Sequence, residues 1–459
     1  MLYDFLRNGQ YADKPLYLQI YFSVRAAIEN GSLKKGDKLP SIRQLCDHLT
    51  ISKTTVIAAY DQLKAEGYIL NRPQSGYYVA AQFDSLPPSS DMAEISRAEK
   101  QQYFEYDFST KSTDENILNL AAWRKEIKDV INRSYLLTSY GDVQGEETRR
   151  LSLRRYALGV RSVNADESRI VVGAGTQAIL WTLCSILGHG KTVAMQQASF
   201  VQSEFLFRGF DYAVKYFESD EFGVTIDSLD RIKPDIVLIN PNYSGASGCN
   251  MPVSRRLEII AWAKAHGALI LEDDFNGELR YSTLPVPCVQ HYDGERTVYI
   301  GSFSKVLLPS VRISYMVLPE RLLPRYEKVK QLINQTASKA EQLALASYIR
   351  SGRIDGHIRR ARRIYLEKSR LTHESLAHML PEAALRFNET AMYFRAVVPY
   401  DIDRKSVDKA LSQHYIRLMR SHENERDFGI SFSGIPTEKI APGIALLSEI
   451  IRQNKTADR

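Results

Sequence analysis

The chain has 459 residues, of which 44% are hydrophobic and 25% charged, and its formal net charge is +6. This length exceeds one ordinary domain, so we expect two or three domains. The positive charge permits an anionic partner without requiring one. No apolar run reaches the ~18 residues that a membrane span needs, and the first residues lack the pattern of a signal peptide. The four cysteines form no CxxC pair. We therefore expect a cytoplasmic protein with neither a metal site nor disulfides.

Residues 14–80 predict a compact unit of three helices followed by a β-hairpin. Apolar residues recur at helical spacing up to Gly31, then after Ser41 and again after Ser52, and both serines stand where N-caps are expected. The stretch YILNRPQSGYYVA contains two short β runs around a turn. With a three-residue turn between the second and third helices, this is the layout of a winged helix-turn-helix. The alternative is a small helical docking domain.

The outward side of this unit carries hydroxyls and cations, which suit phosphates and base edges. The stretches GDKLPSIRQLCDHLTISKTTVIAAYDQLKAEGYI and SGYYV resemble the GntR family of bacterial repressors and activators. The family often has arginine where Lys53 stands. A lysine can still bind a phosphate, but it lacks the two-donor geometry of arginine. The pattern and the resemblance together indicate DNA contacts at Ser41, Arg43, Ser52, Lys53, Thr54, Thr55, Arg72, Gln74 and Gly76, with Ser75 also at the wing tip.

Residues 81–105 predict a linker, because they combine two adjacent prolines, several serines and mixed charges with little apolar content. From residue 106 to residue 459 the pattern changes. The strand-like runs RIVVGAG, TVAMQ, DIVLIN, ALILED and TVYIGSF alternate with helical stretches, which predicts an α/β domain with a largely parallel sheet. Ligands of such sheets collect at the carboxyl ends of the strands. The region after about residue 320 predicts a smaller α+β subdomain.

Several strand ends carry residues that together suit one cofactor. Lys305 follows TVYIGSF, and apolar surroundings favour its neutral amine, which can form a Schiff base with an aldehyde. Asp273 can hold a protonated pyridine nitrogen, Arg312 suits a phosphate dianion, and the turn 173–177 offers N–H groups to a phosphate. Phe200 can stack on a flat ring. The set specifies pyridoxal 5'-phosphate, although taken singly such an aspartate is more often a cap and such a lysine a solvated one.

The motifs YGDVQG, GAGTQ, MPVSRR, EDDFNGELRY and SFSKVLLPSVRISYMVLP resemble those of the MocR subfamily, over nearly the whole chain. In this subfamily a GntR-type unit is joined to a domain similar to fold-type I, pyridoxal-phosphate-dependent aminotransferases. The resemblance implies a head-to-tail homodimer and a cofactor linked to Lys305. The cofactor contacts that we expect are Gly175, Thr176, Gln177, Phe200, Asn242, Asp273, Phe275, Ser302, Ser304, Lys305 and Arg312.

The chain also departs from the subfamily pattern. Phe275 stands where a tyrosine usually donates a hydrogen bond to the cofactor ring oxygen, and Phe200 replaces the stacking tyrosine. The segment 241–248 reads PNYSGASG instead of the usual Pro-Ser-His-Gln-Tyr-Pro-Thr-Gly. Gln202 stands where some members place a substrate arginine, and Arg426 is the arginine nearest to the stretch DFGISF, where another is often found. We expect Schiff-base formation to be retained and the usual carboxylate clamp to be missing.

A basic run, HIRRARRIYLEKSR at residues 357–370, is more often the solvated face of a helix than a DNA contact. The whole chain is interpreted as a transcriptional regulator that binds a double-stranded DNA operator and senses an amine ligand or pyridoxal phosphate, with negligible transaminase activity. Two alternatives stay open. One is an active aminotransferase with a DNA-binding head, and the other is a regulator whose large domain serves only for dimerisation without a cofactor.

Overall fold

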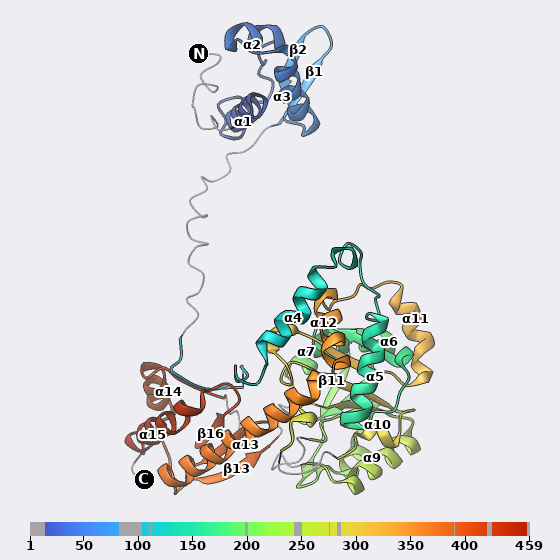
Figure 1. Ribbon diagram of the computed structural model, residues 1–459, viewed down its shortest axis with the longest axis vertical. Coiled ribbons are helices and arrows are strands. Elements are labelled where there is room, and N and C mark those ends of the chain that lie inside the picture. Colours follow the sequence, from blue (N-terminus) through green and yellow to red (C-terminus); the bar gives the residue numbers. More distant parts are fainter. Residues whose placement is uncertain are drawn as a thin grey trace. The chain divides into compact units, whose positions relative to one another are not determined.

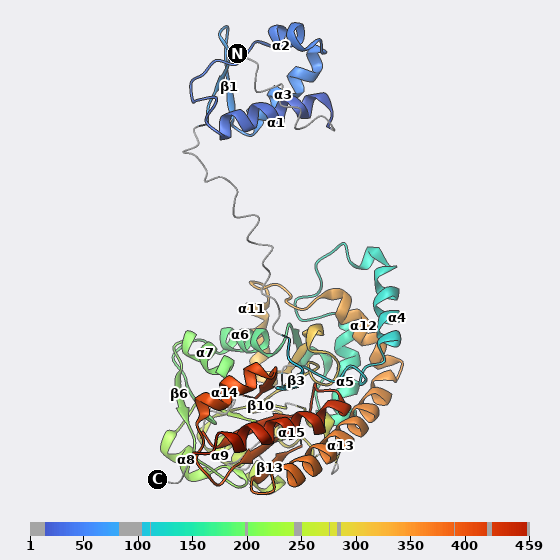
Figure 2. The same cartoon turned by 90° about the vertical axis from the view of Figure 1, so that its left-hand side faces the viewer.

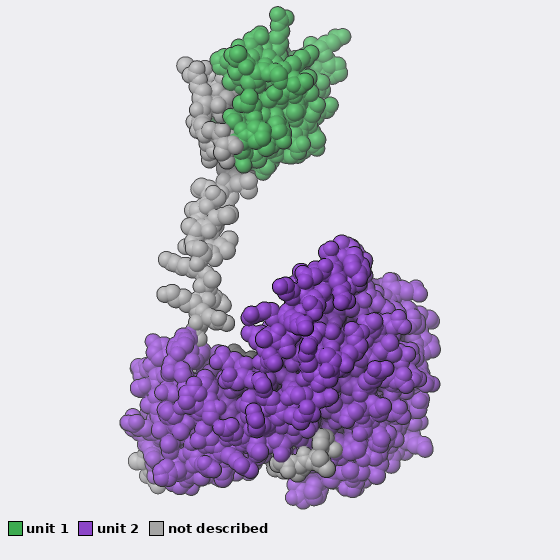
Figure 3. Space-filling model, in the orientation of Figure 1, with its two compact units in different colours: residues 1–102 green, residues 103–459 purple. Residues whose placement is uncertain are grey.

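The structure is a computed structural model that describes residues 14–81, 103–110, 112–197, 201–242, 250–274, 276–281, 286–389, 391–419 and 425–456. It divides into two compact units, residues 1–102 and 103–459 (Figure 1, Figure 3). Phe200, Phe275 and most of the predicted linker lie outside the described residues. Within the described part of the chain, no helix is long and apolar enough to cross a bilayer.

Unit 1 is a winged helix-turn-helix, as predicted. Its elements are α1 (Leu16–Glu29), α2 (Ile42–Leu49), α3 (Lys53–Ala65), β1 (Ile69–Arg72) and β2 (Gly76–Val79). Ser41 and Gln44 cap α2 reciprocally, and the Ser52 hydroxyl accepts a hydrogen bond from the Thr55 N–H at the start of α3. Each cap satisfies backbone donors that the first helical turn leaves unpaired.

The core of unit 1 forms where the apolar faces of its three helices meet. Val24 of α1, Leu45 of α2 and Val56 and Leu63 of α3 are completely buried. The buried Tyr60 hydroxyl donates to the Pro40 carbonyl, 2.9 Å away, and so ties α3 to the loop before α2. The wing β1–β2 is antiparallel, with Ile69 opposite Val79.

Unit 2 is built on a seven-stranded sheet in the order β4-β12-β11-β10-β9-β5-β6. The five strands that the sequence predicted are present. Two strands were not predicted, β6 and the antiparallel β12, which pairs with β11 and β4. The bounds are β4 (Ile170–Gly173), β5 (Thr192–Met195), β6 (Ala213–Tyr216), β9 (Ile236–Ile239), β10 (Leu269–Asp273), β11 (Thr297–Ser302) and β12 (Ser314–Val317).

Side chains of this sheet alternate between two helical layers, as the pleat requires. Val171 and Met316 pack with α6 (Thr176–Leu187), α7 (Val201–Gly209) and α11 (Leu323–Lys330), whereas Val172 and Tyr315 pack with α5 (Glu147–Arg161) and α12 (Lys339–Arg350). The other elements of this region are α4 (Leu120–Ile131), α8 (Ile226–Ile232), α9 (Val253–His266), α10 (Val289–Tyr292), β7 (Ser219–Asp220), β8 (Gly223–Val224) and the short 3₁₀ turns η3 (Ser134–Leu136), η4 (Glu167–Arg169), η5 (Gly277–Leu279), η6 (Pro309–Val311) and η7 (Glu320–Leu322).

The C-terminal part of unit 2 is the predicted α+β subdomain. Its three-stranded antiparallel sheet has the order β13-β14-β16, and α13 and α15 lie side by side (Figure 2). The bounds are α13 (Arg353–Met379), β13 (Ala384–Asn388), β14 (Tyr393–Val397), α14 (Arg404–Gln413), β15 (Ile416–Leu418), β16 (Asp427–Ser431) and α15 (Thr437–Gln453).

The first residues of unit 2 join this subdomain instead of the large sheet. β3 (Tyr106–Phe108) pairs in parallel with β15, and Asp107 contacts Arg417 through an ion pair. The Phe108 ring packs against Gly443 of α15, where a side chain would collide with it. β3 therefore belongs structurally to the C-terminal subdomain, through a contact between residues 310 positions apart that leaves no local sequence signal.

Candidate functional site

Most of the predicted cofactor residues that the structure describes gather at one edge of the large sheet. Ser302 of β11, Ser314 of β12 and Gly173 of β4 lie opposite one another on three adjacent strands. Asp273 ends β10 opposite Ile300 of β11. Because neighbouring strands are about 4.8 Å apart, the edge brings together the residues that follow β4, β9, β10 and β11, namely Gly175, Thr176, Gln177, Asn242, Asp273, Ser302, Ser304 and Lys305, and Arg312 just before β12.

Lys305 is buried, with 9% of its surface exposed. Its Nζ donates to the Thr110 carbonyl at 2.5 Å and to the Ser112 carbonyl at 2.9 Å, and it forms no ion pair with any described residue. Burial lowers the pKa of Lys305 to about 8, although the charge of Asp107 acts in the opposite direction. The amine is therefore held by displaceable backbone acceptors and is close to its neutral, nucleophilic form.

Asp273 presents a carboxylate at the end of β10. No hydrogen bond to this carboxylate is found among the described residues. Burial, and next the negative charge of Asp274, raise the pKa of Asp273 to about 7. A carboxylate in this situation gains from a cationic N–H donor, because the donor offsets both effects.

The start of α6 lies next to the Arg312 guanidinium. Gly175 precedes the helix with φ of +82°, and no side chain caps the first N–H groups of the helix. The Arg312 guanidinium lies against Gly175 so closely that any Cβ there would collide with it. Arg312 is exposed and makes no hydrogen bond or ion pair with a described residue. The Ser314 hydroxyl donates to the Ser302 hydroxyl at 3.0 Å, so hydroxyls, N–H groups and a cation converge where a phosphate can be bound.

Directly after β10, at the same edge of the sheet, Asp274 forms the centre of a buried ionic cluster. Asp274 is paired with Arg161 (Nε to Oδ2, 2.5 Å) and accepts a hydrogen bond from the Tyr299 hydroxyl at 2.7 Å. Burial alone raises the pKa of Asp274, but Arg161, Tyr299 and Asn242 outweigh it and hold the pKa below its usual value. The Asn242 amide, predicted to contact the cofactor, donates to Asp274. Sequence reasoning missed Arg161, because it lies 113 residues before Asp274 and no local pattern links the two.

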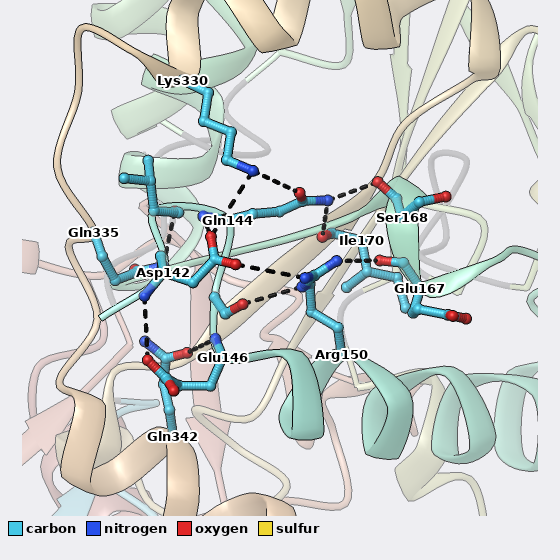
Figure 4. A network of polar contacts seen from close by, with 12 residues as sticks. Asp142, Gln144, Glu146, Arg150, Glu167, Ser168, Ile170, Lys330, Gln335 and Gln342 are labelled. Carbon is cyan, nitrogen blue, oxygen red and sulfur yellow. Dashed lines mark hydrogen bonds and ion pairs between the residues drawn. The ribbon is translucent and has the colours of Figure 1, made fainter. Parts of the chain in front are cut away.

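The YGDVQG loop is fixed by a network of polar contacts, shown from close by in Figure 4. The Gln144 amide donates to the Ser168 and Ile170 carbonyls, at 2.6 and 3.0 Å. Arg150 donates to the Gly145 carbonyl at 3.0 Å, and Gln335 donates to the Val143 carbonyl, also at 3.0 Å. Next to this anchored loop, the side chain of Tyr140 is completely exposed in the single chain.

Neither Gln202 nor Arg426, the two positions considered for a substrate carboxylate clamp, provides one in the structure. Gln202 lies exposed on α7. Arg426 donates to Asp401 at 2.8 Å. In β16, the stretch DFGISF has Met419 packed against Gly429, so that a side chain at this glycine would meet it. None of these residues provides a buried cation beside Lys305.

In unit 1, the predicted DNA contacts divide into two groups. Arg43, Lys53 and Thr54 are exposed, whereas the hydroxyls of Ser41 and Ser52 also serve as helix caps. At the wing, Gln74 and Gly76 have φ of +63° and +112°. The Arg72 guanidinium lies 4.6 Å from the centre of the Tyr78 ring. Tyr78, which sequence reasoning missed, therefore holds Arg72 in place by a cation–π contact.

Comparison with known proteins relates both units to established groups. Residues 16–79 match "Bacterial regulatory proteins, gntR family". The chain is 30% identical to the "Uncharacterized HTH-type transcriptional regulator YdeL" of Bacillus subtilis (strain 168), over 95% of this chain and 96% of that protein. It is also 30% identical to the "Probable rhizopine catabolism regulatory protein MocR" of Rhizobium meliloti, over 78% and 77% of the two chains. An archaeal alanine:glyoxylate aminotransferase has the same fold as the larger part, with a TM-score of 0.70 and 19% identity over 80% of this chain and 95% of that one.

A winged helix-turn-helix joined to an aminotransferase fold defines a class of DNA-binding transcriptional regulators. The relatives share that arrangement over most of their length. The chain belongs to the MocR subfamily of the GntR transcriptional regulators.

Proposed function

We propose that this regulator binds pyridoxal 5'-phosphate at Lys305 and uses the site to sense the cofactor or an amine. When bound, pyridoxal phosphate supplies an aldehyde that condenses with primary amines. The observation that carries the proposal is the buried Lys305 amine, whose pKa is lowered to about 8 and which has no carboxylate partner among the described residues. The family of aminotransferase folds to which unit 2 is similar supports the same cofactor.

The other residues of the edge fit the remaining parts of this cofactor. The Asp273 carboxylate would accept a hydrogen bond from a protonated ring nitrogen. The N–H groups of Thr176 and Gln177, the Ser302 hydroxyl and Arg312 would hold the phosphate. Ser304 and Gly175 would shape the phosphate site. Asn242, Phe200 and Phe275 stay predicted contacts, and Asn242 has to share its amide with Asp274.

The hydrogen bonds of Lys305 suggest how occupancy is sensed. The two bonds to the carbonyls of Thr110 and Ser112 use two N–H groups of the unmodified amine. Attachment of the cofactor through a carbon–nitrogen double bond would leave Nζ with at most one N–H, so at least one of the two bonds would be lost. The predicted domains are the reading head at residues 14–80, the linker at 81–105 and the effector domain at 106–459. Thr110 and Ser112 lie near the start of the effector domain, a few residues after the predicted linker. A loss of their bonds to Lys305 would therefore occur close to the chain that leads to the reading head.

We further propose that the site senses without sustained turnover. Aminotransferases hold the substrate carboxylate so that the reacting bond is oriented, and losing such orientation can cost ~10²-fold in rate. Gln202 and Arg426 do not supply that clamp near Lys305. The ligand is accordingly pyridoxal phosphate itself or a primary amine, and its different affinity for two states of the protein sets DNA binding.

DNA reading is assigned to unit 1 of a cytoplasmic head-to-tail homodimer. The exposed Arg43 and Thr54 contact the operator, and two heads read two half-sites. The second copy is supported by the exposed Tyr140 on its anchored loop and by the exposed apolar residues Leu120, Ile131 and Tyr135 nearby in the chain. Arg43→Ala should cost ~1–3 kcal/mol of operator binding, and unchanged gel shifts would remove this assignment.

The experiment that tests the cofactor proposal uses purified full-length protein. Incubation with pyridoxal phosphate should give a yellow protein, and borohydride should bleach it and leave an adduct on Lys305 in peptide mass spectrometry. A protein that stays colourless and unmodified would favour the dimerisation-only alternative. Steady keto-acid formation from an amino acid, at roughly 1 s⁻¹ or faster, would favour the enzyme alternative.

A further inference from the structure

The outer surface of α13 carries an unusual excess of positive charge. Between positions 350 and 363, at the end of α12 and along α13, the chain holds only one acidic residue, Asp355. In Figure 2, α13 runs along the outer boundary of unit 2. The cations of this stretch are Arg350, Arg353, Arg359, Arg360, Arg362 and Arg363.

Two of these arginines have partners inside unit 2. Arg353 contacts Glu126 of α4 through an ion pair, and Arg362 donates to the Glu278 carbonyl at 2.8 Å. The buried side of α13 is formed by other residues, including Ile354, Ile358 and Tyr365. The remaining arginines point away from that side.

Those four residues, Arg350, Arg359, Arg360 and Arg363, form what we call the arginine face. All four are exposed, and none forms a hydrogen bond or an ion pair with any residue that the structure describes. An ordinary solvated helix face mixes both signs of charge and pairs them at i and i+4. Here, Arg359 and Arg363 at i and i+4 are like-charged, and the acidic residues that flank them at the same spacing, Asp355 and Glu367, form no ion pair with them in the described part of the chain.

We propose that the arginine face binds the phosphate backbone of the DNA that flanks the operator. The proposal rests on the DNA binding of unit 1 and adds a second, sequence-independent contact on unit 2. Arg359 and Arg363 are about 6 Å apart along the helix axis, at ~1.5 Å per residue. Phosphates of one strand follow one another with an axial rise of ~3.4 Å while the backbone also winds around the axis, so a spacing of this size suits neighbouring phosphates of one strand. Arginine suits this task because its planar group binds phosphate through two donors.

The length of the chain between the units permits such a contact. Residues 82–102 connect the described parts of the two units. A stretch of this length can span at most about 75 Å, which corresponds to roughly 20 base pairs of duplex. Flanks of about 20 base pairs on each side of the operator therefore supply duplex over a length similar to the span of this stretch.

The test compares two duplexes with full-length protein. A short duplex holds only the operator, selected from random DNA by the wild-type protein, and a long duplex adds 20 base pairs of unrelated sequence on each side. The variant Arg359→Ala/Arg360→Ala/Arg363→Ala is compared with Lys264→Ala/Arg325→Ala/Lys328→Ala, which removes the same charge from exposed positions elsewhere on unit 2. Dissociation constants are measured from 50 to 200 mM salt.

We expect wild type and the control variant to bind the long duplex more tightly than the short one. The arginine variant should lose that gain, and its plot of log K against log salt for the long duplex should be shallower by about 2–3 per chain bound, at ~0.9 per phosphate contact. Binding to the short duplex should stay unchanged in all three proteins. An arginine variant with the same flank gain and salt slope as wild type would overturn the proposal, as would an equal loss in the control. If no duplex is enriched at all, operator reading itself fails, which is a separate result.

Discussion

Two buried lysines contact residues near the start of unit 2, and they differ in what they bind. Lys305 donates to the carbonyls of Thr110 and Ser112, whereas Lys368 of α13 is paired with the Asp114 carboxylate at 2.5 Å. Burial lowers the pKa of both lysines, and for Lys368 the Asp114 charge opposes the shift. Lys368 is therefore paired with a charged carboxylate, whereas Lys305 has only neutral carbonyl partners, which it can give up more easily.

The different partners of Lys305 and Lys368 indicate which of the two lysines can react. A buried ion pair keeps its lysine protonated and makes removal of either partner costly. A buried lysine held only by carbonyls loses less when it gives up its proton and reacts. The side chain of Ser433 also donates to the Ser112 carbonyl at 3.0 Å, so this acceptor keeps a partner when Lys305 leaves. Lys368 has a structural role in this account, and Lys305 a chemical one.

The largest effect separates the two lysines by reactivity. With pyridoxal phosphate followed by borohydride, wild-type protein should carry the adduct on Lys305 and none on Lys368, because only Lys305 lacks a carboxylate partner. Lys305→Ala and Lys305→Arg should both abolish the adduct completely, and Lys305→Arg should keep a cation beside the two carbonyls. Peptide mass spectrometry measures this. An adduct on Lys368 at similar occupancy would erase the distinction.

A second experiment breaks the paired end. Asp114→Asn and Lys368→Met should each lower the free energy of unfolding of unit 2 by ~3–5 kcal/mol, since each leaves a buried partner uncompensated. The double variant Asp114→Leu/Lys368→Met removes both charges and should recover a large part of the loss. Denaturant titration of the full-length proteins gives these values. A double variant as unstable as the sum of the single ones would show that the pair is not the cause.

A third buried cation extends the comparison to a group without a hydrogen-bonded partner among the described residues. Arg149 of α5 is completely buried, and within that part of the chain none of its three guanidinium nitrogens has a hydrogen-bond partner. Burial lowers the pKa of Arg149 to about 9, so it stays charged at neutral pH. Arg149→Met should raise the free energy of unfolding by on the order of 1–4 kcal/mol. The neighbouring control Arg150→Met, which loses the bond to Gly145, should lower it. A less stable Arg149→Met would contradict this reading.

The smallest effect concerns pH. Only the neutral amine attacks an aldehyde, and a lysine with a pKa of about 8 is roughly one-tenth neutral at pH 7. The rate of adduct formation should therefore rise about tenfold per unit below pH 8 and level off above it. A lysine with the usual pKa of 10.5 would show a rate that keeps rising to about pH 10. Stopped-flow absorbance from pH 6 to 10 distinguishes the two profiles, and continued rise beyond pH 9 would argue against a depressed pKa.

Much of this architecture was accessible from local sequence, because local rules decide it. Ser41 and Ser52 were predicted as caps, since a hydroxyl before an apolar helical period has one well-defined task. The gathering of Asp273 and Lys305 at one edge followed from parallel strands, whose carboxyl ends meet on the same side of the sheet.

Other features depend on partners far apart in the chain. The carbonyls that hold Lys305 come from a position about 195 residues earlier, and a carbonyl carries no residue identity to read. The same distance hides the pairing of Asp274 with Arg161. Strand β12 was missed because it breaks the alternation of strands and helices: only residues 303–313, with the 3₁₀ turn η6, separate it from β11, and an antiparallel neighbour needs no crossover helix. Arg312 lies in the same apolar stretch of sequence as Lys305, but in the fold its side chain is exposed.

The central claim is that attachment of pyridoxal phosphate to Lys305 releases the segment that opens unit 2. Hydrogen exchange of full-length protein tests this most directly, with adduct occupancy at Lys305 measured in the same samples. We expect faster exchange in peptides covering residues 109–114 when Lys305 is occupied, and no faster exchange in the peptides of α6. Full occupancy of Lys305 with unchanged exchange in 109–114 would contradict it.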